Sequence, residues 1–109
     1  MRTIIQVSLL LTLLIVSGAA EQADQAAIDL AAAIRTETID GDLDAAIRQY
    51  ATIAENSRRA IAAEALLRMG GAYEKLGRPE AREAYARVVR DYADQTEPVA
   101  AVRARLAAL

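Results

Sequence analysis

The stretch Leu66–Tyr85, LLRMGGAYEKLGRPEAREAY, decides the fold of this chain. It contains a helical pattern, a turn at Gly77-Arg78-Pro79 and a second helical pattern. Gly often ends a helix in the left-handed conformation, and Pro fits the first turn of the next helix. Gly70 and Gly71 lie inside the first pattern, where each destabilises a helix by up to about 1 kcal/mol relative to Ala. A helix that keeps both glycines indicates that another backbone packs close to it.

Apolar residues at three- and four-residue spacing continue on both sides of this stretch and predict further helices. The expected helices cover residues 24–39, 43–55, 59–76, 79–92 and 97–109. Gly41 is expected to end the first of them, and Asp42 to cap the second. The chain is 54% hydrophobic but only 4% aromatic, and β-branched residues are sparse, which argues against a β-sandwich. The composition therefore predicts an all-α fold.

The predicted helices at 43–55 and 79–92 match each other at an offset of 35 residues, with Ala46 on Ala81 and Tyr50 on Tyr85. A period in this range, formed by helix-turn-helix units, is typical of solenoids. The second unit resembles the tetratricopeptide repeat, in which a bulky apolar residue is followed by Leu-Gly, Tyr, a turn Gly, a small Ala and an aromatic residue. In this chain those positions hold Leu66, Met69-Gly70, Tyr73, Gly77, Ala81 and Tyr85.

The first unit departs from this pattern. It keeps Gly41, Ala46 and Tyr50, but Glu37 stands where the repeat has Tyr. In the second unit, Ala93 stands where the family has Pro. The resemblance implies a right-handed α-solenoid of antiparallel helix pairs, with units at about 27–57 and 60–94. The helix at 97–109 looks like the start of a third unit.

In such units, small residues at Gly70 and Ala81 let the paired helices approach closely. Tyr73 and Tyr85 are expected to fill the space between one pair and the next. Replacing Ala81 by a larger residue should therefore overpack the contact.

Residues 1–20 resemble a secretory signal peptide. Arg2 carries the positive charge, Ile4–Val16 is a nearly unbroken apolar run, and small residues follow at 17–20. Cleavage after Ala20, or after Ala19, would leave a mature domain of residues 21–109 in the periplasm or outside the cell. The alternative is an uncleaved membrane anchor, because residues 3–20 are uncharged. Both interpretations place the rest of the chain outside the cytoplasm.

The residue types argue against catalysis. The chain has no His and no Cys, which excludes thiol nucleophiles, His bases and zinc sites built from these ligands. Ser57 is better explained as a cap, and the Asp40–Asp44 stretch lacks the Gly and closing Glu of a calcium loop. A net charge of −2, mixed in sign, does not indicate nucleic-acid binding. We therefore expect no enzyme, no cofactor and no metal.

The resemblance also implies a binding groove, because the first helix of each tetratricopeptide pair lines the concave face that holds partner segments. Arg35, Arg68 and Lys75 would suit a partner carboxylate or carbonyl. Ordinary solvated charges are the alternative for these positions. Ile28 and Ala31 fall on the same predicted face. The residues carried over as the candidate groove are Arg35, Thr38, Glu64, Leu67, Arg68, Gly71, Glu74 and Lys75.

These observations predict an exported protein–protein interaction module or adaptor that binds a protein or peptide. It is similar to cell-envelope members of the family, such as the Tol–Pal-associated repeat protein and the outer-membrane assembly lipoproteins. One alternative is the N-terminal module of a larger secreted protein, of the kind that precedes a β-propeller. Another is a self-associating, membrane-anchored envelope protein. The apolar end at Leu106–Leu109 suggests a continuation or a homo-oligomer formed through residues 97–109.

Overall fold

The computed structural model describes residues 25–109, so the predicted signal segment at 1–20 lies outside the described residues. Within residues 25–109, all regular structure is helical. A helix over residues 25–38, called the first helix below, precedes four others. They are α2 (Leu43–Asn56), α3 (Arg59–Lys75), α4 (Glu80–Asp91) and α5 (Thr96–Ala108). The ends of these four differ from the predicted ranges by one residue at most.

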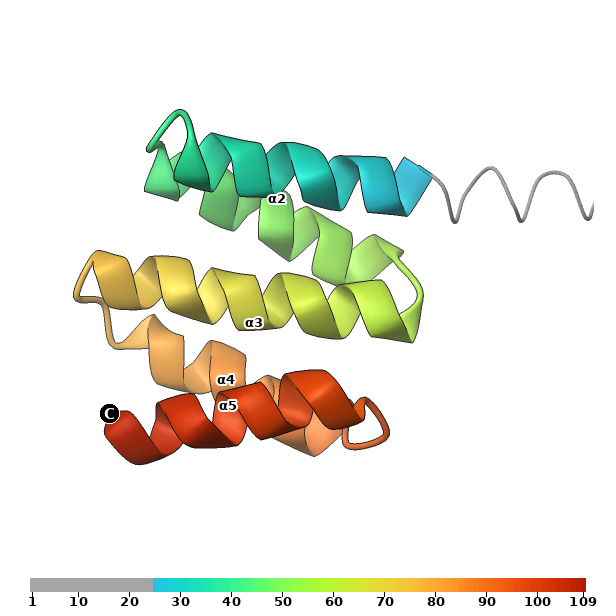
Figure 1. Ribbon diagram of the computed structural model, residues 1–109, viewed down its shortest axis with the longest axis vertical. Helices are drawn as coiled ribbons and strands as arrows, with labels where there is room; N and C mark the ends of the chain where they lie inside the picture. The colour runs from blue at the N-terminus through green and yellow to red at the C-terminus, as the bar shows by residue number, and fades with distance from the viewer. Residues whose placement is uncertain (1–24) are drawn as a thin grey trace, which may run out of the picture.

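Helices that follow one another in the chain pack against each other. α2 contacts α3, α3 contacts α4, α4 contacts α5, and α3 also contacts α5. Figure 1 shows that the first helix, α3 and α5 form one layer, and that α2 and α4 form a second layer behind it. None of these helices combines the length and the apolar character needed to cross a membrane.

Both predicted glycine turns have the backbone conformation that glycine favours. Gly41 and Gly77 have φ values of 67° and 66°, in the left-handed region. After α3, the Arg78 N–H donates to the Tyr73 carbonyl at 2.9 Å, which satisfies a carbonyl at the helix end. Asp42 caps α2, because its side chain accepts a hydrogen bond from the Ala45 N–H at 3.0 Å. These turns keep successive helices close together.

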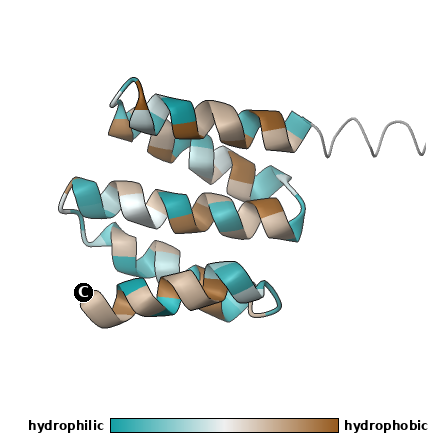
Figure 2. Ribbon diagram, in the orientation of Figure 1, coloured by the Kyte–Doolittle hydropathy of each residue, from teal (hydrophilic) through white to brown (hydrophobic). Residues whose placement is uncertain are grey.

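The core lies between the two layers. Its largest fully buried side chains are those of Tyr50, Leu66, Tyr85, Val88 and Val102. Figure 2 shows brown apolar segments and teal polar segments side by side on the same helices, as expected for helices with one buried face. The apolar spacing in the sequence therefore corresponds to burial between layers.

The contact between α3 and α4 explains one of the two adjacent glycines. A Cβ added at Gly70 would lie 2.3 Å from Cε1 of Tyr85, which leaves no room for any side chain. The close neighbour of Gly70 is thus an aromatic ring rather than a backbone. We expected Tyr85 to fill the space between successive pairs, but its ring lies on Gly70 within the α3–α4 contact. Tyr73, which we expected in a similar role, is half-buried.

Candidate functional site

A concavity of about 520 Å³ crosses the layer formed by the first helix, α3 and α5. α3 supplies most of its lining, the first helix closes one side and α5 closes the other. Seven of the eight residues that we predicted for the groove line it, namely all except Arg35. The lining consists of Glu37, Thr38, Glu64, Leu67, Arg68, Gly71, Glu74, Lys75, Ala101 and Arg105.

The α3 residues of the concavity share one helix face because they recur every three or four positions from Glu64 to Lys75. The opposite face of α3 carries Leu66 and Gly70, which are buried. α3 therefore separates the core from the concavity, and its polar face is available for contacts outside the core.

The first helix meets α3 differently from our expectation. Arg35 is exposed and does not line the concavity, and the same holds for Ile28 and Ala31. Successive residues of an α-helix are about 100° apart, so Glu37 lies roughly 200° around the helix from Arg35. Glu37 is the residue that faces α3, and its neighbour Thr38 joins it in the lining.

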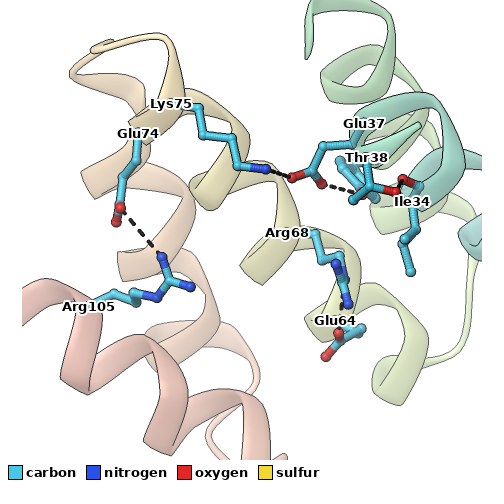
Figure 3. A network of polar contacts seen from close by, with 9 residues as sticks. Ile34, Glu37, Thr38, Glu64, Arg68, Glu74, Lys75 and Arg105 are labelled. Carbon is cyan, nitrogen blue, oxygen red and sulfur yellow. Dashed lines mark hydrogen bonds and ion pairs between the residues drawn. The ribbon is translucent and has the colours of Figure 1, made fainter. Parts of the chain in front are cut away.

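Glu37 is the centre of a complete polar network. Its side chain is buried, and the Tyr50 hydroxyl donates to its Oε1 at 2.7 Å. The Lys75 ammonium donates to its Oε2 at 2.5 Å. Figure 3 shows Lys75 reaching from α3 to Glu37 on the first helix. The carboxylate thus ties the first helix, α2 and α3 together.

The protonation behaviour of this network follows from its geometry. Burial by itself would raise the pKa of Glu37, but hydrogen bonds from Lys75 and Tyr50 outweigh it and lower that pKa. Burial raises the pKa of Tyr50, and the neighbouring Glu37 carboxylate raises it further. Glu37 is therefore held as a carboxylate, and Tyr50 as a neutral hydrogen-bond donor.

A second set of the same groups lies between α3, α4 and α5. Arg105 Nη1 lies 3.5 Å from Oε2 of Glu74, and Figure 3 shows the two side chains pointing toward each other. Oε1 of Glu74 and the hydroxyl of Tyr85 are both buried without a hydrogen-bond partner. Burial raises the pKa of Tyr85, and a hydrogen-bonding and charge interaction with the nearby Glu74 carboxylate raises it further. The two groups are close enough to interact but do not form a hydrogen bond of standard geometry.

In two of the three ion pairs that line the concavity, the cation is more exposed than its carboxylate partner. The side chain of Lys75 is 53% exposed, whereas that of its partner Glu37 is 6% exposed. Arg105 is 55% exposed and Glu74 is 26% exposed. Arg68 contacts Glu64 at 3.3 Å on the same helix face. Each of these cations therefore has N–H groups left over for a ligand while a neighbouring carboxylate balances its charge.

Sequence reasoning missed three residues of the lining, Glu37, Ala101 and Arg105. Glu37 carried a signal, because a carboxylate at the Tyr position of the repeat must find partners if it is buried. Arg105 also carried one, because it follows Arg68 by 37 residues, the offset that relates the last helix to the third. The position of Ala101 became evident only from the packing of α5 on α3.

Other parts of the described chain give weaker indications of a ligand. A hollow of about 410 Å³ between the first helix and α2 includes Asp29, Arg48 and Gln49, and it contains no buried unpartnered atom. Within residues 25–109, no three His, Cys, Asp or Glu side chains come together in a way that would hold a metal ion. The concavity over α3 is therefore the better candidate site.

Comparisons with known proteins gave no match for this chain. No protein-family model matches the sequence, and no curated protein or solved structure matches it either.

Proposed function

We propose that this chain is an exported tetratricopeptide-type interaction module that holds a protein or peptide segment in the concavity over α3. The helices would form a right-handed solenoid of antiparallel pairs. Support comes from the two-layer arrangement in Figure 1 and from the repeated left-handed glycines, Gly41 and Gly77. Tyr50 and Tyr85, which are equivalent under the 35-residue offset, are both fully buried.

One observation carries the proposal. Residues selected only for their place in the repeat converge on a single concavity of about 520 Å³. Most of them lie on α3, the first helix of the second unit, which is the helix expected to face a partner. Six of the seven share one face of α3 by their spacing, and Thr38 joins them from the first helix, far away in the sequence.

The chemistry of the concavity suits an extended polypeptide. Lys75, Arg68 and Arg105 have N–H groups beyond those used in their ion pairs, and these can donate to carbonyl oxygens of a bound chain. Leu67 and Gly71 supply a small apolar floor between the charged groups. Polar rim contacts around a small apolar centre are typical of protein interfaces.

We also propose that the module has no catalytic activity of its own. The chain has neither His nor Cys, and its charged groups in the concavity are paired with one another. Export rests on the sequence of residues 1–20. Mass analysis of protein recovered from the periplasm or medium should show a mature N-terminus at Ala20 or Glu21, and an intact leader there would contradict cleavage.

The binding role can be tested by capture of partners from an envelope extract. Wild-type protein and an Arg68→Glu variant would be compared, because Arg68 lines the concavity and its replacement reverses one rim charge. Arg82→Glu is the matched control, since Arg82 is exposed on α4 and does not line the concavity. We expect partners that bind wild type and Arg82→Glu but not Arg68→Glu. Identical partner sets for all three proteins would count against the groove.

A further inference from the structure

The two Tyr–Glu–cation sets are similar but not equally complete. In the first, Glu37 receives hydrogen bonds from Tyr50 at 2.7 Å and from Lys75 at 2.5 Å. In the second, the one hydrogen bond of standard geometry to Glu74 is the 3.5 Å contact from Arg105. Its other oxygen, Oε1, has no partner although it is buried. Relative to the glycine turns, Glu74 lies one position later than Glu37. It lies near enough to Tyr85 to raise the pKa of that hydroxyl, but without the hydrogen-bond geometry that joins Glu37 to Tyr50.

Tyr85 supplies an independent observation at the same point. Its side chain is fully buried, and its hydroxyl has no hydrogen-bond partner. Burying a polar group without a partner destabilises a protein by roughly 1–3 kcal/mol, so such a group calls for an explanation. The hydroxyl lies beneath Gly71, since a Cβ added there would be 3.9 Å from it.

Gly71 has no packing reason to be glycine. Unlike Gly70, it could accept a Cβ that meets nothing closer than the Tyr85 hydroxyl at 3.9 Å. Its φ is not in the left-handed region. Glycine here thins the wall between the concavity, which Gly71 lines, and the unpartnered pair beneath it.

Comparing the set around Glu37 with the set around Glu74 shows which group Glu74 lacks. Glu37 has a tyrosine hydroxyl and a primary ammonium, and the Arg68 guanidinium also lies close enough to lower its pKa. One carboxylate in this concavity thus accommodates two cations. Glu74 has its guanidinium, Arg105, but no ammonium.

We propose that a lysine side chain of the bound partner supplies that ammonium, donating to Glu74 and to the Tyr85 hydroxyl beside Gly71. The ligand class is therefore a polypeptide segment with a lysine that points into the concavity between α3 and α5. Carboxylate and hydroxyl oxygens accept hydrogen bonds, and an ammonium offers three donors. This inference rests on the proposed function, because it names the residue by which the concavity recognises its partner.

The test begins with peptides selected for binding from a random peptide display library. In each selected peptide, every lysine is replaced in turn by norleucine, which keeps the four-carbon chain of lysine and removes its ammonium group. The dissociation constant is then measured for wild type and for Glu74→Gln. Glu55→Gln is the control, because Glu55 is exposed on α2 and does not line the concavity.

We expect norleucine at one position to weaken binding to wild type and Glu55→Gln about tenfold, the factor that corresponds to ~1.4 kcal/mol. On Glu74→Gln, both peptides should bind equally and weakly. Tyr85→Phe should weaken binding of the lysine-containing peptide, while the melting temperature of the variant protein should not fall. Gly71→Ala should weaken binding of the same peptide while the melting temperature of the variant protein rises. A purely structural role for Gly71 would not move binding and stability in opposite directions.

Two results would overturn the inference, and they differ in what else they affect. Peptides that bind in the concavity without needing lysine would refute the lysine contact and leave the proposed function standing. Failure to select any binding peptide would remove both the proposed function and the lysine contact that depends on it.

Discussion

The two buried tyrosines allow one substitution to be compared at two matched sites. Tyr50 and Tyr85 are both fully buried and lie 35 residues apart, the offset at which α2 and α4 match. The hydroxyl of Tyr50 donates to Glu37 at 2.7 Å, whereas that of Tyr85 has no hydrogen-bond partner. Replacing each by Phe removes one oxygen atom and leaves the ring, so the comparison isolates the loss of the Tyr50 hydrogen bond from the loss of the Tyr85 hydroxyl.

The magnitudes follow from those contacts. A hydrogen bond to a charged group contributes about 1.5–3 kcal/mol, and Tyr50→Phe also leaves Oε1 of Glu37 buried without that donor. We therefore expect Tyr50→Phe to lower the free energy of unfolding by about 2 kcal/mol. Tyr85→Phe loses no hydrogen bond and removes an unpartnered buried hydroxyl, so we expect no loss, and a gain of up to about 1 kcal/mol.

Urea unfolding followed by circular dichroism measures both values. Thermal unfolding gives a second readout, because about 1 kcal/mol shifts the melting temperature of a domain of this size by roughly 4–8 °C. Combining Tyr50→Phe with Glu37→Gln should give less than the sum of the two losses, since the residues share one hydrogen bond. Equal losses for the two tyrosines, or a larger loss for Tyr85→Phe, would refute the assignment of the complete and incomplete sets.

Three further predictions concern packing and protonation. Gly70→Ala should lower the free energy of unfolding by about 1–3 kcal/mol, because its Cβ would lie 2.3 Å from the Tyr85 ring. In the same urea experiment, Gly71→Ala should raise the free energy of unfolding by up to about 1 kcal/mol. Ala81→Leu should overpack a buried position and lower the melting temperature, with an unchanged melting curve counting against the contact. Because the pKa of Glu37 is lowered from its ordinary value of 4.5, its contribution to stability is present above that pH and is lost as the pH falls through the folded-state pKa. When the free energy of unfolding is measured at decreasing pH, it should therefore fall less below about pH 4.5 for Glu37→Gln than for wild type.

Local chemistry made the helices predictable. The glycines at 41 and 77 were expected to end helices, and both adopt the left-handed conformation. Asp42 was expected to cap α2, and it does. These features depend on a few neighbouring residues, so they can be inferred without knowledge of the tertiary contacts. The pairing of helices into a solenoid, which requires long-range geometry, remains a proposal.

The candidate site was predictable where it depended on one helix. The polar face of α3 follows from the three- and four-residue spacing between Glu64 and Lys75, and its residues do line one concavity. The contribution of the first helix was less predictable, since Arg35 lies outside and Glu37 lies inside. Periodicity identifies the faces of a helix but does not say which face a neighbouring helix will contact.

The sequence by itself determined where the helices begin and end and which face of α3 is polar. Only the tertiary structure decided that Gly70 accommodates the ring of Tyr85, whereas a Cβ at Gly71 would meet nothing closer than the Tyr85 hydroxyl at 3.9 Å. Only the tertiary structure decided that both oxygens of Glu37 accept a hydrogen bond, whereas Oε1 of Glu74 accepts none of standard geometry. The physical reason is that these contacts join side chains 13 to 38 residues apart in the chain, or lie between helices whose rotation is set by the core. A shift of one position in a helix turns a side chain by about 100°, which is enough to complete or to open a hydrogen-bond network.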